Sequence, residues 1–95
     1  MPRKNGRKAP ARRRVSFKLS APDASKVYLA GSFNEWDPEA RVLRRDAKGI
    51  WKTSMLLEPG AYEFRFLVDG EWLNDPEAEQ VPNGFVSKNS LLTVM

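Results

Sequence analysis

The stretch from residue 57 to residue 73 constrains the fold more than any other part of the chain. Its large apolar residues fall at every second position, and they are Tyr62, Phe64, Phe66 and Val68. Such alternation over aromatic and β-branched residues predicts a half-buried β-strand. Asp69-Gly70 follows, a dipeptide that supplies the positive φ angles of a tight hairpin turn. We therefore expect a strand that turns and returns through residues 71–73, with Arg65 on the face opposite the core.

Five further segments have the composition of short strands, and they cover residues 15–20, 26–32, 41–45, 50–57 and 89–94. Turn clusters separate them, and residues 74–88 are predicted to form a polar loop because Pro76, Pro82 and Gly84 interrupt them. No segment has a helical period. About seven short strands joined by turns predict an all-β fold, an antiparallel β-sandwich.

The composition excludes several classes of protein. The chain of 95 residues is long enough for one small domain, and it contains neither cysteine nor histidine. It therefore lacks disulfides, a thiolate nucleophile and the commonest general base and zinc ligand. No apolar run has the length of a membrane span, and no hydrophobic segment follows the basic N-terminus as in a secretory signal. A cytoplasmic protein is the expectation on these grounds.

The charge is divided unevenly along the chain. The net charge is +4, but residues 1–14 hold seven of the 16 basic residues and no acidic residue, which leaves residues 15–95 at −3. We predict a disordered basic tail over residues 1–14 and a mildly acidic domain over residues 15–95. The tail has two interpretations: a solvated leader, or an electrostatic arm that binds nucleic acid or another polyanion.

Two tryptophans and one arginine are candidates for a binding surface. Trp36 follows Phe33 among polar residues, so it either contacts a ligand or closes one end of the sandwich. Trp72 lies just past the hairpin turn and either contacts a ligand or packs on an edge strand. Arg65 either binds a ligand or is solvated beside its acidic neighbours. Trp51 falls on the same face of its predicted strand as Met55, and it is therefore predicted to lie in the core.

Four pieces of the sequence, in order, carry a family resemblance. They are Val-Tyr-Leu-Ala-Gly-Ser-Phe-Asn-Glu-Trp (27–36), Gly-Ile-Trp (49–51), Tyr-Glu-Phe-Arg-Phe-Leu-Val-Asp-Gly-Glu-Trp (62–72) and Asn-Asp-Pro (74–76). Over residues 15–95 the chain resembles the family 48 carbohydrate-binding modules, which include the glycogen-binding domain of the AMP-activated protein kinase β subunit and the early-set domain of isoamylases. The resemblance implies an immunoglobulin-like sandwich of the early-set type that binds α-1,4-linked glucans.

The resemblance also implies which residues bind the sugar. In the family two tryptophans stack on glucose rings, a basic residue between them contacts hydroxyls, and a loop before the last strand adds an apolar residue and polar contacts. These positions fall on Trp36, Arg65, Trp72, Phe85, Ser87 and Asn89. The family usually has lysine in place of Arg65. A planar indole suits the apolar C–H face of a pyranose, and polar side chains at its edge satisfy the hydroxyl rim.

The expected function is non-catalytic binding of glycogen, starch or a maltooligosaccharide, with no cofactor or metal. Glycoside hydrolysis needs two carboxylates that flank the scissile bond, but Asp69 and Asp75 are both explained by turns. The partner would be a glucan-metabolising enzyme or a kinase. The alternative is an early-set domain that binds another protein without sugar, while residues 1–14 contact a polyanion such as nucleic acid.

Overall fold

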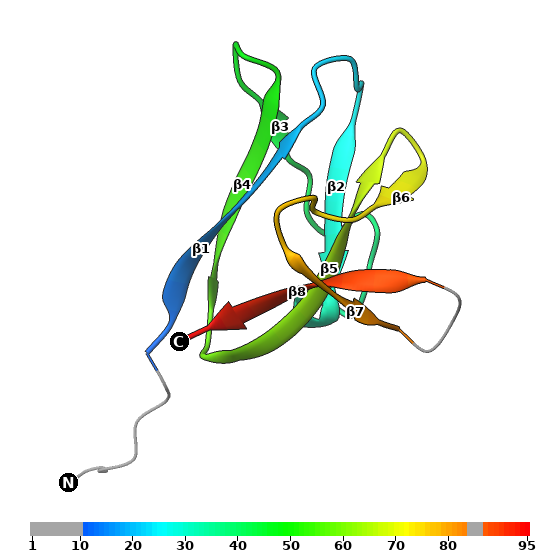
Figure 1. The fold of residues 1–95 in the computed structure, drawn as a ribbon. Coiled ribbons are helices and arrows are strands. Elements are labelled where there is room, and N and C mark those ends of the chain that lie inside the picture. Colours follow the sequence, from blue (N-terminus) through cyan, green and yellow to red (C-terminus); the bar gives the residue numbers. More distant parts are fainter. Residues whose placement is uncertain (1–10, 84–86) are drawn as a thin grey trace, which may run out of the picture.

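The computed structural model describes residues 11–83 and 87–95 of the chain. This part contains eight strands and one short 3-10 helix (Figure 1): β1 (Arg13–Ser20), β2 (Val27–Gly31), η1 (Ser32–Asn34), β3 (Arg44–Arg45), β4 (Ile50–Leu57), β5 (Gly60–Val68), β6 (Glu71–Leu73), β7 (Glu79–Pro82) and β8 (Lys88–Val94). Within the described ranges no helix has the length and apolarity to cross a membrane.

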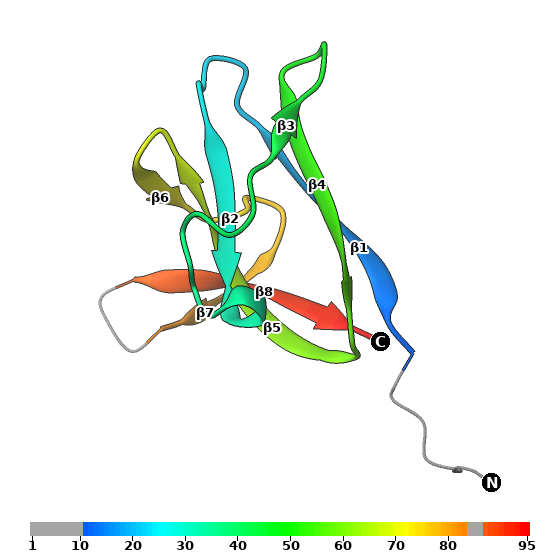
Figure 2. The same cartoon turned by 180° about the vertical axis from the view of Figure 1, so that it is seen from behind.

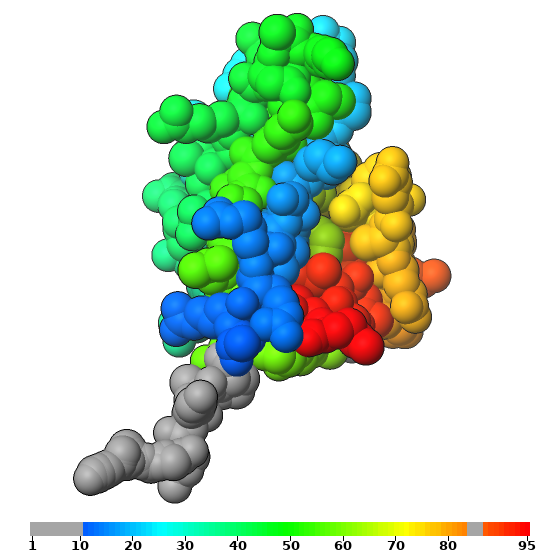
Figure 3. Space-filling view, turned by 90° about the vertical axis from the view of Figure 1, so that its left-hand side faces the viewer, coloured from blue at the N-terminus to red at the C-terminus, as the bar shows by residue number. Residues whose placement is uncertain are grey.

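The strands form two antiparallel sheets. One sheet has the order β1-β4-β3, and the other has the order β2-β5-β8-β7 with β6 paired to β5. The sheets face each other across the core, as the two opposite views show (Figures 1 and 2). On the open side of the sandwich, β1 lies beside the C-terminal end of β8 (Figure 3). The prediction of an all-β, immunoglobulin-like antiparallel sandwich of the early-set type is confirmed.

The core is built from the inward faces of both sheets. Phe64 and Phe66 are buried, as the alternation in β5 predicts, and Phe17 of the opposite sheet meets Phe64 edge to face with ring centroids 5.2 Å apart. Phe33 from η1 packs on Phe17 at 5.6 Å. Trp51 is 7% exposed, and its Nε1 donates a hydrogen bond to the carbonyl of residue 21 at 2.8 Å, so the prediction of a core role is confirmed.

Three strand predictions differ from the structure. Residues 74–88 are not all loop, because β7 pairs with the free edge of β8. This strand forms although its sequence has no alternating apolar pattern that would predict it. The predicted strand 41–45 is divided: Val42 forms a bridge with Tyr28 of one sheet, whereas β3 pairs with β4 of the other. β1 begins at Arg13, two residues earlier than predicted, whereas residues 1–10 of the predicted tail lie outside the described residues.

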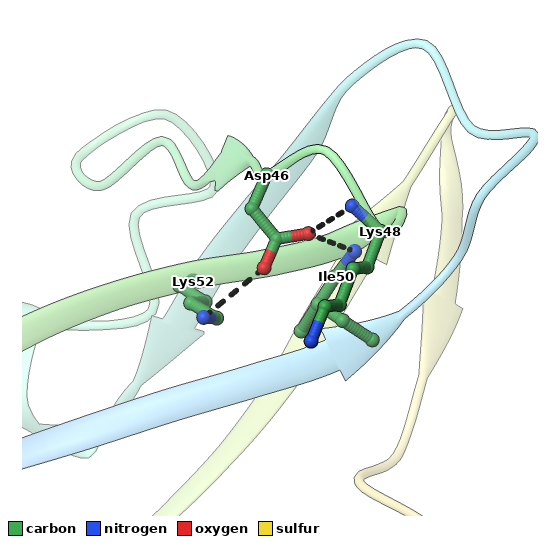
Figure 4. A network of polar contacts seen from close by, with 4 residues as sticks. All are labelled: Asp46, Lys48, Ile50 and Lys52. Carbon is green, nitrogen blue, oxygen red and sulfur yellow. Dashed lines mark hydrogen bonds and ion pairs between the residues drawn. The ribbon is translucent and has the colours of Figure 1, made fainter.

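Asp46 organises the turn between β3 and β4 (Figure 4). One carboxylate oxygen accepts hydrogen bonds from the backbone N–H of Lys48 at 2.8 Å and of Ile50 at 3.0 Å, and the other lies 3.1 Å from Lys52 Nζ. The hydrogen bond from Ile50, followed by the interaction with Lys52, lowers the pKa of Asp46 from 3.8 to about 2. The charged form is therefore favoured in the folded state.

This shift predicts how stability depends on pH. Because the folded pKa of Asp46 lies below its ordinary value, the stabilisation is complete above about pH 4 and is lost as the pH falls through 2. We expect Asp46→Asn to lower the midpoint of thermal unfolding clearly more at pH 7 than at pH 2. Asp23→Asn is the control, since the Asp23 carboxylate contacts no partner in the described part of the chain. A destabilisation by Asp46→Asn of equal size at both pH values would contradict the prediction.

Candidate functional site

The turn after β2 is shaped by a compact set of polar contacts. Asn34 Oδ1 accepts a hydrogen bond from the N–H of Gly31 at 3.0 Å, and Asn34 Nδ2 donates one to the carbonyl of Leu29 at 3.2 Å. Ser32 Oγ accepts a hydrogen bond from the N–H of Glu63 on β5 at 3.2 Å. These contacts fix the turn to the end of β2 and to β5. They give a structural role to the side-chain amide of Asn34 and to the hydroxyl of Ser32 in the Gly-Ser-Phe-Asn motif.

Trp36 is presented to solvent by an unusual backbone conformation. Both Glu35 and Trp36 have left-handed φ angles, of 58° and 59°, which side chains other than glycine adopt at a cost of about 1 kcal/mol or more. The N–H of Trp36 donates to the carbonyl of Gly31 at 2.9 Å and closes the turn. Trp36 as a residue is 36% exposed. The turn therefore holds Trp36 at the surface and does not bury it as a plug.

Arg65 lies on the outer face of β5 and is held by the beginning of β8. Its Nε and Nη2 donate hydrogen bonds to the carbonyl of Lys88 at 3.0 and 2.6 Å, and Nη2 also donates to Ser87 Oγ at 2.9 Å. Nη1 has no partner among residues 11–83 and 87–95. The edge formed by Nε and Nη2 therefore fixes the position of the guanidinium, and Nη1 is a further donor that these contacts do not use.

Trp72 is positioned by the hairpin between β5 and β6. Asp69, with a φ of 48°, forms the turn with Gly70, and its carboxylate accepts hydrogen bonds from the backbone N–H of Lys26 at 2.8 Å and of Ser25 at 3.0 Å. The hairpin is thus attached to the beginning of β2. Trp72 pairs with Leu67, which lies two residues from Arg65 in β5 and therefore on the same outer face. Trp72 shares this face and is 43% exposed.

These three side chains line one depression. The depression has a volume of about 300 Å³ and is lined by Trp36, Arg65, Trp72, Asn83 and Asn89; we call it the tryptophan hollow. It combines two aromatic side chains with a cation and two amides. Flat apolar faces beside fixed donors suit a ligand that has apolar ring faces and a rim of hydroxyl groups.

The polar contacts that were predicted from the loop before the last strand also approach the hollow. Ser87 is hydrogen-bonded to Arg65, whereas Asn89 lines the hollow and is largely buried. Asn89 Nδ2 donates to Glu63 Oε1 at 3.0 Å, and Asn89 Oδ1 accepts a hydrogen bond from Asn83 Nδ2 at 3.3 Å. Phe85, the predicted apolar contact, lies outside the described residues.

Asn83 is a lining residue that the sequence did not indicate. Its Nδ2 also donates to Ser87 Oγ at 2.8 Å, so it joins Ser87, which precedes β8, to Asn89 of β8. The only signal in the sequence was its position between Pro82 and Gly84, which is typical of a turn and does not distinguish a ligand contact.

A larger hollow, of about 670 Å³, is lined by the end of β1, the β3–β4 turn, the beginning of β4 and residues 75–77. It is lined by both basic and acidic side chains and by no aromatic residue. Asp75 accepts a hydrogen bond from the N–H of Glu77, and Asp69 is occupied by the contacts given above. Each of the two carboxylates thus has a role in a turn. Among the described residues no group of three or more acidic side chains is placed to hold a metal ion.

Arg65 offers a direct test of the geometry of the tryptophan hollow. Lysine keeps the charge and also has three donors, but all three radiate from one nitrogen, so they cannot reproduce the planar fork that bonds to Ser87 and the Lys88 carbonyl along one edge and presents Nη1 on another. We expect Arg65→Lys to weaken maltoheptaose binding roughly threefold to tenfold, the loss of one hydrogen bond to a charged group. Isothermal titration calorimetry measures the affinity, with Arg44→Lys on the other sheet as the control. Equal affinities for Arg65→Lys and the parent would show that the fork is not needed.

Comparisons of the sequence with protein families and with individual proteins agree on one family. The profile of a family described as the glycogen recognition site of AMP-activated protein kinase matches residues 14–95. Rice (Oryza sativa subsp. japonica) FLOURY ENDOSPERM 6 is 44% identical over 71 residues, which cover 75% of this chain and 13% of the relative. Arabidopsis thaliana PTST homolog 2 is 39% identical over 69 residues, which cover 73% and 13%. The human 5'-AMP-activated protein kinase subunit beta-1 is 29% identical over 87 residues, which cover 92% and 31%.

The chain therefore spans less than a third of the length of each of these relatives. The comparison also corrects one expectation. The rice and Arabidopsis relatives are chloroplastic proteins, so the prediction of a cytoplasmic protein is wrong. That prediction relied on the absence of a membrane span and of a hydrophobic leader, and neither observation distinguishes one aqueous compartment from another.

Proposed function

Because the chain belongs to the family of the glycogen recognition site of AMP-activated protein kinase, we propose that it binds an α-1,4-linked glucan by stacking glucose rings on Trp36 and Trp72. The observation that supports this most is that two exposed tryptophans line one hollow with Arg65, whose Nη1 has no partner in the described part of the chain. Each indole covers the apolar face of a pyranose, and the guanidinium donates to hydroxyl groups between them.

Polar side chains at the beginning of β8 and just before it complete the proposed site. Ser87 and Asn89 are held by Arg65, Asn83 and Glu63, so their orientations are set before a ligand arrives. Such preorganisation reduces the entropy lost on binding. Phe85 is proposed, from the family resemblance alone, to add an apolar contact. A polymer with many identical rings engages several copies of the module at once, so weak single contacts are sufficient.

The module is proposed to act without catalysis and to bring a partner to storage polysaccharide. In this proposal Asp69 and Asp75 keep their roles in turns, so this pair of carboxylates does not flank a glycosidic bond. The partner is proposed to be a glucan-metabolising enzyme or a kinase. The support for this is that the relatives are much longer than the matched region and include a kinase subunit.

Electrophoresis in native gels tests the proposal. We expect glycogen in the gel to retard the protein, and dextran, whose glucose units are α-1,6-linked, to leave its mobility unchanged. A variant without residues 1–10 controls for attraction by the basic N-terminal segment. Mobility that is unaffected by glycogen in both proteins would contradict glucan binding and would favour an interaction domain without sugar.

A further inference from the structure

Strand register aligns four apolar side chains across the outer face of the sheet that carries the tryptophan hollow. Trp72 pairs with Leu67, Leu67 pairs with Tyr28, and Tyr28 forms a bridge with Val42. Residues opposite one another in antiparallel strands point to the same face. We call these four residues the apolar row; it crosses four neighbouring segments, or about 14 Å at the usual strand spacing.

The far end of the apolar row is formed by the segment that changes sheets. The N–H of Leu43 donates to the carbonyl of Val27, and the N–H of Leu29 donates to the carbonyl of Arg41, both at 2.9 Å. These two bonds flank the bridge between Tyr28 and Val42, so the two side chains form a closely spaced pair. Leu43 is buried, whereas Val42 is 51% exposed. Val42 therefore points outward, like Tyr28.

The rim of the apolar row carries groups that can hydrogen-bond. Lys26 Nζ lies 5.8 Å from the centre of the Tyr28 ring, and Tyr28 itself ends in a hydroxyl group. The row thus shares with the tryptophan hollow an apolar surface that is bordered by hydrogen-bond donors, and Tyr28 adds a further flat ring to it. The row also begins at Trp72, which already lines that hollow, so a ligand that leaves the hollow over this indole meets the row next.

We propose that the apolar row is an extension of the binding site, which holds further glucose units of the same α-1,4-linked chain beyond Trp72. This inference rests on the proposed glucan binding. Short oligosaccharides fill the tryptophan hollow alone, whereas longer ones also cover Leu67, Tyr28 and Val42. The row thus makes affinity depend on chain length, and the module discriminates long glucan chains from short ones.

The experiment compares maltotriose with maltoheptaose by isothermal titration calorimetry. The test variant is Tyr28→Thr/Val42→Thr, in which threonine keeps the preference for strands and removes most of the apolar surface. We expect the variant to bind maltotriose within about twofold of the parent and to bind maltoheptaose about tenfold more weakly. Leu56→Thr, at a half-exposed position on the outer face of the other sheet, is the matched control and should change neither affinity.

Amide shifts of the unmodified protein give a second readout that does not depend on the variant folding. Maltoheptaose should shift the amides of Tyr28, Val42 and Leu67, and maltotriose should not. Equal loss of both affinities in the variant, or no shift at these amides, would overturn the apolar row but would leave the tryptophan hollow in place. If the parent binds neither oligosaccharide, the proposed function fails and this inference fails with it.

Discussion

Trp72→Ala is expected to lower the affinity for maltoheptaose about thirtyfold or more, and Trp36→Ala is expected to have an effect of similar size. Each indole supplies one flat wall of the tryptophan hollow. Truncation of a central aromatic contact in a binding site typically costs about 2 kcal/mol or more, which corresponds to a factor of about thirty in affinity. Both indoles are substantially exposed, so their removal leaves no cavity in the core. Calorimetry with maltoheptaose measures the loss.

Conservative variants separate stacking from a general loss of structure. Trp72→Phe and Trp36→Phe keep a planar ring of smaller area, so each should retain part of the affinity that the alanine variant loses. Thermal unfolding should show nearly the same midpoint for the parent and all four variants. The assignment of the site would be wrong if both alanine variants bound maltoheptaose as tightly as the parent.

Gly31→Ala is expected to destabilise the protein by about 3 kcal/mol and to abolish glucan binding with it. The φ of Gly31 is extended and suits any residue, so the constraint is space and not conformation. An added Cβ would lie 2.5 Å from the carbonyl oxygen of Glu63 and 2.7 Å from the Phe33 ring. The first of these is backbone of the neighbouring strand, so β2 and β5 would have to separate where the Trp36 turn begins. Chemical denaturation measures the free energy of unfolding.

Gly70→Ala is the matched control for this prediction. Gly70 has a φ of +89°, but among the described residues no atom beyond its own chain neighbours lies within 4 Å of the Cβ that alanine would add. We therefore expect only the strain of a left-handed residue, about 1 kcal/mol. If Gly31→Ala were no more destabilising than Gly70→Ala, the close approach of β2 and β5 would not be the reason for glycine at this position.

The hairpin was predictable from the sequence because two independent signals agree there. The alternation in β5 sets which side chains enter the core, and Asp69-Gly70 sets where the strand turns. With the parity fixed, Arg65 and Trp72 must lie on the outer face. The resemblance then indicated that Trp36 comes from another part of the chain to meet them, and the structure places all three around one hollow.

Features that depend on distant partners were not predictable in this way. β7 forms because it pairs with the free edge of β8. Its own sequence does not predict a strand, since it contains Pro82 and the acidic residue Glu79, which are both uncommon in strands. The segment 41–45 changes sheets without a change in its apolar pattern, so Val42 appeared to belong to the same strand as Arg44. The left-handed turn at Trp36 contains no glycine at the strained positions and gave no local signal.

Indole N–H resonances in a titration with maltoheptaose test the central claim most directly, because the chain has three tryptophans and one of them is an internal control. Trp51 is buried, and its Nε1 is bonded to the carbonyl of Ala21. We predict that the signals of Trp36 and Trp72 shift together along one saturable curve while that of Trp51 stays in place. If neither exposed indole shifts, or if all three shift alike, the tryptophan hollow is not the glucan site.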